Sequence, residues 1–173
     1  TTGDASWLGQ TGDSYARFIT SPQNYNYAGI VGGLPPSQWT NFRDGKKVTV
    51  ASNTSVKVGV QCDDNCIVYM DGQAIISSAP WSADYTTTVT LTPGAHQFGV
   101  SLFNGGTASG ASGFAFAAVR VSDGVSLSVS DVTWQAANYW NTTDQNPFSY
   151  DSTFRPNPDL LVAGTAKVLV VGG

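Results

Sequence analysis

The strongest constraint on the fold is a run of alternating apolar and polar residues between positions 56 and 70. Apolar side chains recur at every second position (Val56, Val58, Val60), the acidic segment Asp63-Asp64-Asn65 follows, and a second apolar run covers residues 66–70. Period-two alternation gives a strand one buried and one solvated face, and clustered Asp and Asn mark turns. The pattern therefore predicts two antiparallel strands joined by a tight turn.

Further segments of the same kind occur along most of the chain. They predict strands at 15–20, 86–92, 96–102, 114–121, 125–134 and 167–171. Apart from the strand at 15–20, residues 1–45 are irregular, and residues 138–159 show no regular period. No segment has the pattern of an amphipathic helix or an internal repeat. The predicted fold class is all-β: an antiparallel β-sandwich (jelly roll) of eight to ten strands with no substantial helix.

The chain of 173 residues is long enough for one domain with its own core. We expect a single β-sandwich domain over residues 1–163, with an irregular N-terminal segment at 1–45. Residues 164–173 are expected to form a terminal strand that leads into a glycine-rich continuation, because the sequence ends in Gly172-Gly173.

The charge of the chain argues against two classes of partner. Only 12% of the residues are charged, the net charge is −4, and the eight basic residues are scattered. Nucleic-acid binding requires clustered Lys and Arg, so no nucleic-acid partner is expected. No run of 18 apolar residues occurs, so membrane insertion is not expected either. Low charge with many small polar residues favours an extracellular or virion protein.

The two cysteines lie on either side of the acidic segment. If the segment is a hairpin loop, Cys62 and Cys66 face each other at a Cα separation of about 4.5–5.5 Å, which a disulfide tolerates. A disulfide is therefore predicted, with two reduced thiols as the alternative. A zinc site is not expected, because the chain has no second pair of ligands.

A family resemblance covers residues 48–121. The residues that carry it are Val-x-Val before Asp63-Asp64, then Tyr69-x-Asp71-Gly72, Trp81, Leu91-x-x-Gly94-x-His96, Val100 and Asn104. This succession resembles the galactose-binding-like and PA14-like β-sandwiches. The resemblance implies a jelly-roll sandwich that often serves as a carbohydrate-binding or adhesion module, although a fold does not by itself establish a function.

The C-terminal segment carries a second resemblance. The sequence Thr-Ala-Lys-Val-Leu-Val-Val-Gly-Gly at 165–173 resembles the strand that opens glycine-rich segments in phage tail-fibre and tail-tip proteins. This implies a receptor-binding domain from a virion fibre, where the chain would form a homotrimer.

Residues for catalysis are scarce. The chain has a single histidine and no glutamate, whereas a nucleophilic triad needs a base beside Ser or Cys. His96 shares its phase with Phe98 and Val100, so we expect it to be buried at a strand end and bonded through one ring nitrogen. Glycoside hydrolysis needs two opposed carboxyl groups in a cleft, and adjacent turn residues such as Asp63 and Asp64 do not supply them.

The acidic segment allows two interpretations. Asp and Asn stabilise tight turns by bonding to their own backbone, which makes Asp63-Asp64-Asn65 a structural turn. The alternative is a calcium site held by Asp63 and Asp64, because hard cations bind clustered carboxylate oxygens, and some PA14-like adhesins hold calcium and sugar with adjacent aspartates. Asp71-Gly72 is expected to be a hairpin turn only.

Aromatic residues are the main candidates for ligand binding. The chain has five Trp, seven Tyr and eight Phe, and the C–H face of a sugar stacks on such rings while its hydroxyls bond to polar side chains. The expected ligand-binding residues are Trp81, Asp84, Tyr85, Asp63, Asp64, Asn104, Trp140 and Tyr139; Trp39 and Tyr150 come next. The alternative is that these rings pack beneath long loops with wet polar tips.

Arg120 is the one charged residue within the apolar segment at 114–121. It needs an acidic partner or a place at a strand end. We therefore expect a structural ion pair, with binding of a sugar diol or carboxylate as the alternative.

Three functions are compatible with these observations. The leading hypothesis is a non-catalytic receptor-binding or adhesion domain on a phage tail fibre or tail tip that recognises a host-surface glycan, with no cofactor other than the calcium considered above. The second is a structural virion module, such as a capsid decoration or fibre spacer. The third is a carbohydrate-binding module of a secreted bacterial protein.

Overall fold

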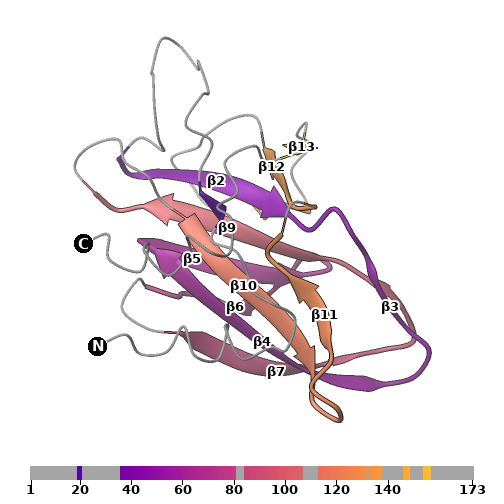
Figure 1. Cartoon of the computed structure of the whole chain (residues 1–173). Helices are drawn as coiled ribbons and strands as arrows, with labels where there is room; N and C mark the ends of the chain where they lie inside the picture. The colour runs from indigo at the N-terminus through magenta and orange to yellow at the C-terminus, as the bar shows by residue number, and fades with distance from the viewer. Residues whose placement is uncertain are drawn as a thin grey trace.

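The fold is an all-β sandwich, as the alternation predicted. The computed structural model describes residues 19–20, 36–80, 84–106, 113–131, 133–137, 146–148 and 154–156. Within these ranges the chain forms thirteen strands and no helix, and all strand pairings are antiparallel (Figure 1). The number of strands exceeds the predicted eight to ten because several span only two or three residues. None of the described segments is a helix long and apolar enough to cross a membrane.

One layer is a five-stranded sheet. Its central strands are β4 (Thr54–Asp63) and β10 (Gly113–Arg120), and β7 (Tyr85–Leu91) pairs with the other side of β4. On the far side of β10 lie two short strands, β1 (Ile19–Thr20) at its start and β11 (Ser126–Val129) towards its end. The segment at 15–20 is thus a strand over its last two residues, and residues 15–18 lie outside the described part of the chain.

The second layer is a six-stranded sheet. In spatial order its strands are β13 (Phe154–Pro156), β12 (Gln135–Ala137), β2 (Gln38–Arg43), β9 (Phe98–Asn104), β5 (Asn65–Met70) and β6 (Gln73–Ile76). A separate two-stranded ribbon, β3 (Val48–Val50) with β8 (Gly94–His96), extends from one end (Figure 1). The expected strand at 167–171 lies outside the described residues.

The core lies between the two sheets and consists of the inward-facing residues of each. Strand β4 contributes the alternating valines 56, 58 and 60, all fully buried. Aromatic rings connect the layers: Phe42 lies 5.0 Å from Phe114, and Phe98 lies 5.2 Å from Phe116, between ring centroids. These four rings are fully buried, so each contributes roughly 1.5–3 kcal/mol by leaving water.

The segment between Cys62 and Cys66 is not a hairpin, contrary to the prediction. Strand β4 ends at Asp63 within the five-stranded sheet, where Asp63 pairs with Gly113. Strand β5 begins at Asn65 within the six-stranded sheet, where Asn65 pairs with Phe103. The chain therefore crosses from one layer to the other at Asp64. Sequence alternation alone could not reveal this, because both paths point the same residues into the core.

Strand β2 corrects the expectation that residues 1–45 are irregular. It has no period-two hydrophobic pattern, because Thr40 and Asn41 are polar and yet buried. Its centre is covered on both faces of the sheet, so polar residues are hidden there and alternation is lost.

The turn between β5 and β6 is a hairpin turn, as predicted, but it also makes long-range contacts. Asp71 and Gly72 have φ values of 50° and 85°, as a tight hairpin turn requires. The Asp71 carboxylate also accepts hydrogen bonds from the Gln97 backbone N–H at 2.8 Å and from the His96 ring at 2.6 Å. These contacts help to explain why the predicted strand at 96–102 is divided at Gln97 into β8 and β9.

His96 is buried at the end of β8, as predicted, but it is bonded through both ring nitrogens. Nδ1 contacts the Asp71 carboxylate, and Nε2 lies 2.8 Å from the backbone carbonyl oxygen of Thr92. Both partners are acceptors, so the doubly protonated ring satisfies them best. The hydrogen bonds to Thr92 and Asp71 raise the pKa of His96.

Candidate functional site

One end of the sandwich gathers the polar ends of several strands. Here β4 ends, β5 and β7 begin, and β9 ends. Tyr85, the first residue of β7, lies opposite Val60, three residues before Asp63 along β4 and so roughly 10 Å from it. The predicted site residues that the structure describes all belong to this end: Asp63, Asp64, Asp84, Tyr85 and Asn104. We call it the corner end, after the crossing at Asp64.

Asp64 connects the corner to the end of β9. Its backbone N–H donates to the Phe103 carbonyl at 3.2 Å, and one carboxylate oxygen accepts a hydrogen bond from the Gly105 N–H at 2.7 Å. Asp64 remains partly exposed. One of its oxygens is therefore committed to the chain, while the side chain still lies at the surface where a ligand could reach it.

Asn104 ends β9 and is held by its neighbours. Its side-chain oxygen accepts the Gly106 N–H at 3.0 Å, and its backbone carbonyl accepts the Ser37 N–H at 2.8 Å. Only 4% of the residue is exposed. Asn104 thus lies beside Asp64, as a shared site requires, but its principal role is to fix the chain that leaves β9.

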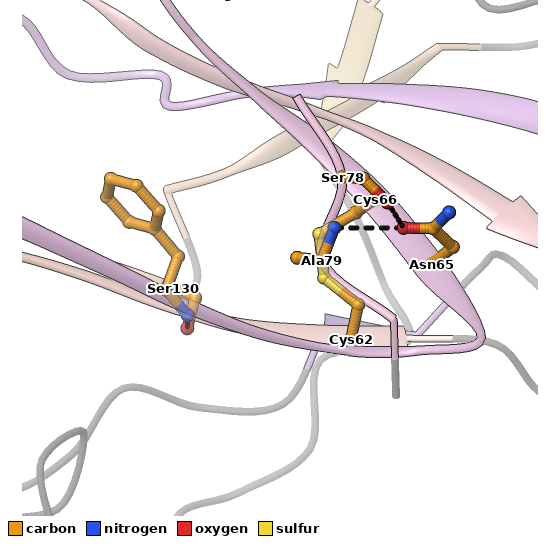
Figure 2. The surroundings of a disulfide bond; sticks show 7 residues. Cys62, Asn65, Cys66, Ser78, Ala79 and Ser130 are labelled. Carbon is orange, nitrogen blue, oxygen red and sulfur yellow. Dashed lines mark hydrogen bonds between the residues drawn. A yellow bond between two sulfur atoms is a disulfide. The ribbon is translucent and has the colours of Figure 1, made fainter. Parts of the chain in front are cut away.

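Asn65 is a residue of this end that sequence reasoning did not select as a ligand-binding residue. Its side-chain oxygen accepts hydrogen bonds from the Ala79 N–H at 2.9 Å and the Ser78 hydroxyl at 3.3 Å (Figure 2). Two backbone bonds between Cys66 and Ala79, at 3.0 and 3.3 Å, extend this attachment. The segment after β6 is therefore fastened to the start of β5. Asn commonly bonds to backbone groups in corners and turns, so the residue type alone could have indicated this structural role of Asn65.

A disulfide joins Cys62 and Cys66 across the corner, with their Cα atoms 6.0 Å apart (Figure 2). Both cysteines are buried in the core. Because Cys62 belongs to one sheet and Cys66 to the other, the bond links the two layers directly beneath Asp64 and Asn65. It therefore fixes the polar groups of the two sheets relative to each other.

Asp84 and Tyr85 lie at the start of the edge strand β7. Tyr85 is half-buried and packs against the hydrophobic core, so much of its ring contacts protein and is not free to stack on a ligand. Asp84 is also partly buried. These two residues border the corner end, and neither lies at its centre.

An aromatic pair provides partly exposed apolar surface at this end. Trp39 on β2 and Phe103 on β9 lie opposite each other, with ring centroids 4.8 Å apart and planes tilted by 35°. Phe103 also lies opposite Asn65 on β5, so Asn65, Phe103 and Trp39 follow one another across the outer face of the six-stranded sheet. Both rings are half-buried. Trp39 was a secondary candidate from sequence, and Phe103 was missed because it belongs to an apolar strand.

Several predicted residues lie outside the described part of the chain: Trp81, Tyr139, Trp140 and Tyr150. Of Asp63, the backbone alone is described. Arg120 lies at the end of β10 and forms an ion pair with Asp123, with 3.1 Å between Nε and the carboxylate oxygen. Arg120 therefore forms a structural ion pair, as expected from the sequence.

The calcium interpretation of Asp63 and Asp64 finds few further ligands. Among the described residues, no group of three or more His, Cys, Asp or Glu side chains could hold a metal ion together. Asp64 would contribute one carboxylate with an oxygen already bonded to Gly105. A cation here would need backbone carbonyls, water or the ligand itself to complete its shell.

A second polar cluster lies at the opposite end of the sandwich. Asp44, Lys46 and Asp131 line a cavity of about 140 Å³, smaller than the roughly 300–1,000 Å³ of typical small-molecule sites. The Asp44 carboxylate accepts bonds from the Ser128 hydroxyl at 2.5 Å and the Lys46 N–H at 2.8 Å. The Lys46 ammonium lies 3.0 Å from Asp131. These internal bonds indicate a structural cluster.

The carboxyl groups of this cluster have different pKa shifts. Burial raises the pKa of Asp44, and the nearby charge of Asp131 adds to the rise, although hydrogen bonds from Ser128 and Lys46 oppose it. Burial also acts to raise the pKa of Asp131, but hydrogen bonds from Thr133 and the Lys46 ammonium bring it below its ordinary value. In this cluster the charged form of Asp131 is favoured by its ion pair with Lys46, whereas the charged form of Asp44 is disfavoured by burial.

Known structures of similar fold include sugar-binding proteins. A lectin from Pleurotus ostreatus in complex with GalNAc has a TM-score of 0.57 and 22% sequence identity over 84% of this chain and 41% of its own. The apo form of this lectin has a TM-score of 0.56 and 22% sequence identity, over 81% of this chain and 40% of its own. A GH78 family rhamnosidase of Bacillus sp. GL1 has a TM-score of 0.51 and 18% sequence identity, over 70% of this chain and 13% of its own.

At these identities the likeness establishes the fold alone, a β-sandwich as the resemblance implied. The chain spans about two fifths of the lectin's length and a smaller part of the rhamnosidase. No protein-family model matches the sequence, and no curated protein sequence matches it significantly.

Proposed function

We propose that this chain is a non-catalytic carbohydrate-binding module that recognises a cell-surface glycan through its corner end. The observation that carries the proposal is the meeting of an aromatic pair, Trp39 and Phe103, with Asp64 and Asn65. Aromatic rings can cover the apolar face of a pyranose, and the carboxylate and amide can bond to its hydroxyls. Small-molecule sites commonly have this mixture of apolar surface and a few polar groups.

The structural likeness adds support from a different direction. The lectin of Pleurotus ostreatus was crystallised with GalNAc, so a protein with this sandwich fold holds a sugar. We therefore propose a neutral hexose or N-acetylhexosamine as the first ligand to test. Calcium at Asp64, with Asp63, remains part of the proposal, because a bound sugar can supply the missing oxygen ligands.

The proposed biological setting is a phage tail fibre or tail tip, or another extracellular surface. Support comes from the C-terminal sequence at 165–173 and from the low charge of the chain. Repeated display on a fibre, including a homotrimer, would raise weak single-site binding through multivalency. A module of a secreted bacterial enzyme is the second candidate, supported by the likeness to a small part of a rhamnosidase.

A glycan array probed with the labelled chain tests the function directly, once with calcium and once with a chelator. We expect a defined set of glycans to bind, and Trp39→Ala and Asp64→Ala each to weaken binding at least tenfold, about 1.4 kcal/mol. Trp81→Ala is a third variant suggested by sequence. Asp123→Ala, at the far end of β10 with its side chain 47% exposed, is the matched control for Asp64→Ala.

Two results would contradict the proposal. One is an array with no bound glycan in either condition. The other is binding that all three site variants retain at full strength while their thermal unfolding matches that of the parent chain, which would place the ligand elsewhere.

A further inference from the structure

Arg43 lies on the outer face of the six-stranded sheet, away from the corner end. Its neighbour in sequence, Phe42, points into the core, so Arg43 faces outwards. It ends β2 opposite Gly99 of β9 on one side and Gln135 of β12 on the other. It lies five positions along β2 from Gln38, which pairs with Asn104 at the corner end, a distance of roughly 17 Å.

The Arg43 guanidinium is held by an aromatic ring. Its central carbon lies 3.8 Å from the centroid of the Phe154 ring, a cation–π contact. The residue is partly buried, and burial lowers the pKa of Arg43. This contact restricts the motion of the guanidinium, so less entropy is lost when a partner binds.

Arg43 has no acidic partner within the described part of the chain, where the ion pairs join other residues. Its Nε is buried without a hydrogen-bond partner, although the residue as a whole is only partly buried. The Nε of Arg120 also lacks a hydrogen bond, but Arg120 has a counterion, because Asp123 lies 3.1 Å from it. A partly buried charge without a counterion is unfavourable, and an unsatisfied polar group of this kind requires an explanation.

The unpaired atoms of this sheet face are not confined to Arg43. Asn41 on β2 and Ser101 on β9 lie directly opposite each other, and each has a buried side-chain oxygen without a hydrogen-bond partner. Asn41 lies two residues before Arg43 and therefore shares its face. Of the three, Arg43 is only partly buried, whereas Asn41 and Ser101 are buried, so a ligand would reach Arg43 first.

We propose that Arg43 binds the carboxylate of an acidic sugar, such as a hexuronic acid. The planar guanidinium offers parallel N–H groups that match the two oxygens of a carboxylate, and Phe154 fixes it in one orientation. Gln135, opposite Arg43 in register and partly exposed, can bond to ring hydroxyls. One cation fits a monoanion better than a phosphate, which carries nearly two charges and usually several basic partners.

The sugar as the source of the carboxylate rests on the proposed function, but the anion site itself does not. A glycan with neutral and acidic units could contact the corner end and Arg43 at once, or two glycans could bind separately. Either arrangement predicts that an acidic sugar binds more tightly than its neutral counterpart, and that the difference depends on Arg43.

The test is an NMR titration of the ¹⁵N-labelled chain with galacturonate, its neutral methyl ester, galactose and acetate. We expect galacturonate to bind at least fivefold more tightly than the ester and than acetate, with shifts at residues 43, 135 and 154. Arg43→Gln should abolish this preference, Arg43→Lys should lose most of it because the planar fork is absent, and Phe154→Leu should reduce it. Arg120→Gln is the matched control and should preserve the preference.

The inference is overturned if galacturonate and its ester bind equally, or if Arg43→Gln keeps the preference in a chain that unfolds normally. Acetate binding as tightly as galacturonate would show that the sugar contributes nothing, which also overturns it. Galactose binding at the corner without a preference for galacturonate would refute this inference alone. Arg43-dependent galacturonate binding with a silent array would refute the glycan site at the corner end alone.

Discussion

Removing the Cys62–Cys66 disulfide should destabilise the fold in two separable steps. The bond closes a loop of five residues, and the chain-entropy model assigns such a loop about 2 kcal/mol of stabilisation. Replacing both cysteines with alanine also removes two sulfur atoms from the core, where both side chains are buried. Voids of that size cost about 1 kcal/mol each.

The expected order of stability is therefore oxidised chain, reduced chain, then the double variant Cys62→Ala/Cys66→Ala. The reduced chain keeps its sulfur atoms and loses the cross-link alone, so its unfolding free energy should fall by about 2 kcal/mol. For a domain of this size that corresponds to a Tm lower by roughly 4–8 °C. The double variant should fall by about 4 kcal/mol in all.

Urea unfolding followed by tryptophan fluorescence measures all three forms, and mass spectrometry after iodoacetamide treatment verifies the redox state. Linear extrapolation resolves differences of this size. If the oxidised and reduced chains agree within about 0.5 kcal/mol, the cross-link does not restrain the unfolded chain as argued. If the double variant matches the reduced chain, the sulfur atoms contribute no packing energy.

Two further predictions concern stability. Gly45→Ala should lower the free energy of unfolding by about 1–3 kcal/mol, because an added Cβ would lie 2.2 Å from the Thr133 carbonyl oxygen. The control in the same urea assay is Gly105→Ala, whose Cβ would meet nothing closer than 3.4 Å. The raised pKa of His96 stabilises the fold fully below the unfolded-state pKa of about 6.5, and this stabilisation is lost as pH rises through the higher folded-state pKa. Unfolding free energies measured from pH 5.5 upwards should therefore fall through this range in the parent chain and fall less in His96→Gln; identical slopes would contradict the argument.

The sequence was sufficient to predict the class of fold and the strands in which one face is buried. The apolar residues at 56, 58 and 60 and at 98, 100 and 102 all face the core, so their pattern reports their environment. Strand β2 could not be found in this way, since Asn41 is buried although polar and lies on the outer face. Its place depends on pairing with β9, some sixty residues later, and local periodicity does not contain that information.

The crossing at Asp64 shows a second limit. A hairpin and a corner both bring Cys62 near Cys66, so the cysteine spacing predicts the disulfide in either case. The two paths differ in distant partners: Asp63 pairs with Gly113, and Asn65 pairs with Phe103. These pairings decide which sheet each strand joins, and they depend on packing of the whole core.

For the candidate site, sequence reasoning found turn residues more readily than the aromatic surface. Asp64 and Asn104 are polar residues at strand ends, and in an antiparallel sandwich strand ends collect at two edges of the molecule. Phe103 was not selected from the sequence, because the predicted strand at 96–102 ends at the neighbouring core residue Leu102. Its ring lies on the other face, where Trp39 meets it at 4.8 Å, and the register of β2 on β9 determines that contact.

The position of the disulfide connects stability to the proposed binding. Asp64 and Asn65 lie at the point where the chain leaves one sheet for the other. Their positions relative to the two sheets therefore depend on how rigid this corner is. The Cys62–Cys66 bond and the attachment of Asn65 to Ala79 restrain that corner from both sides. A binding site formed from two sheets gains affinity when its groups are fixed before the ligand arrives. Reducing the disulfide should therefore weaken glycan binding at the corner by more than it changes binding at Arg43, which lies about 17 Å away along β2.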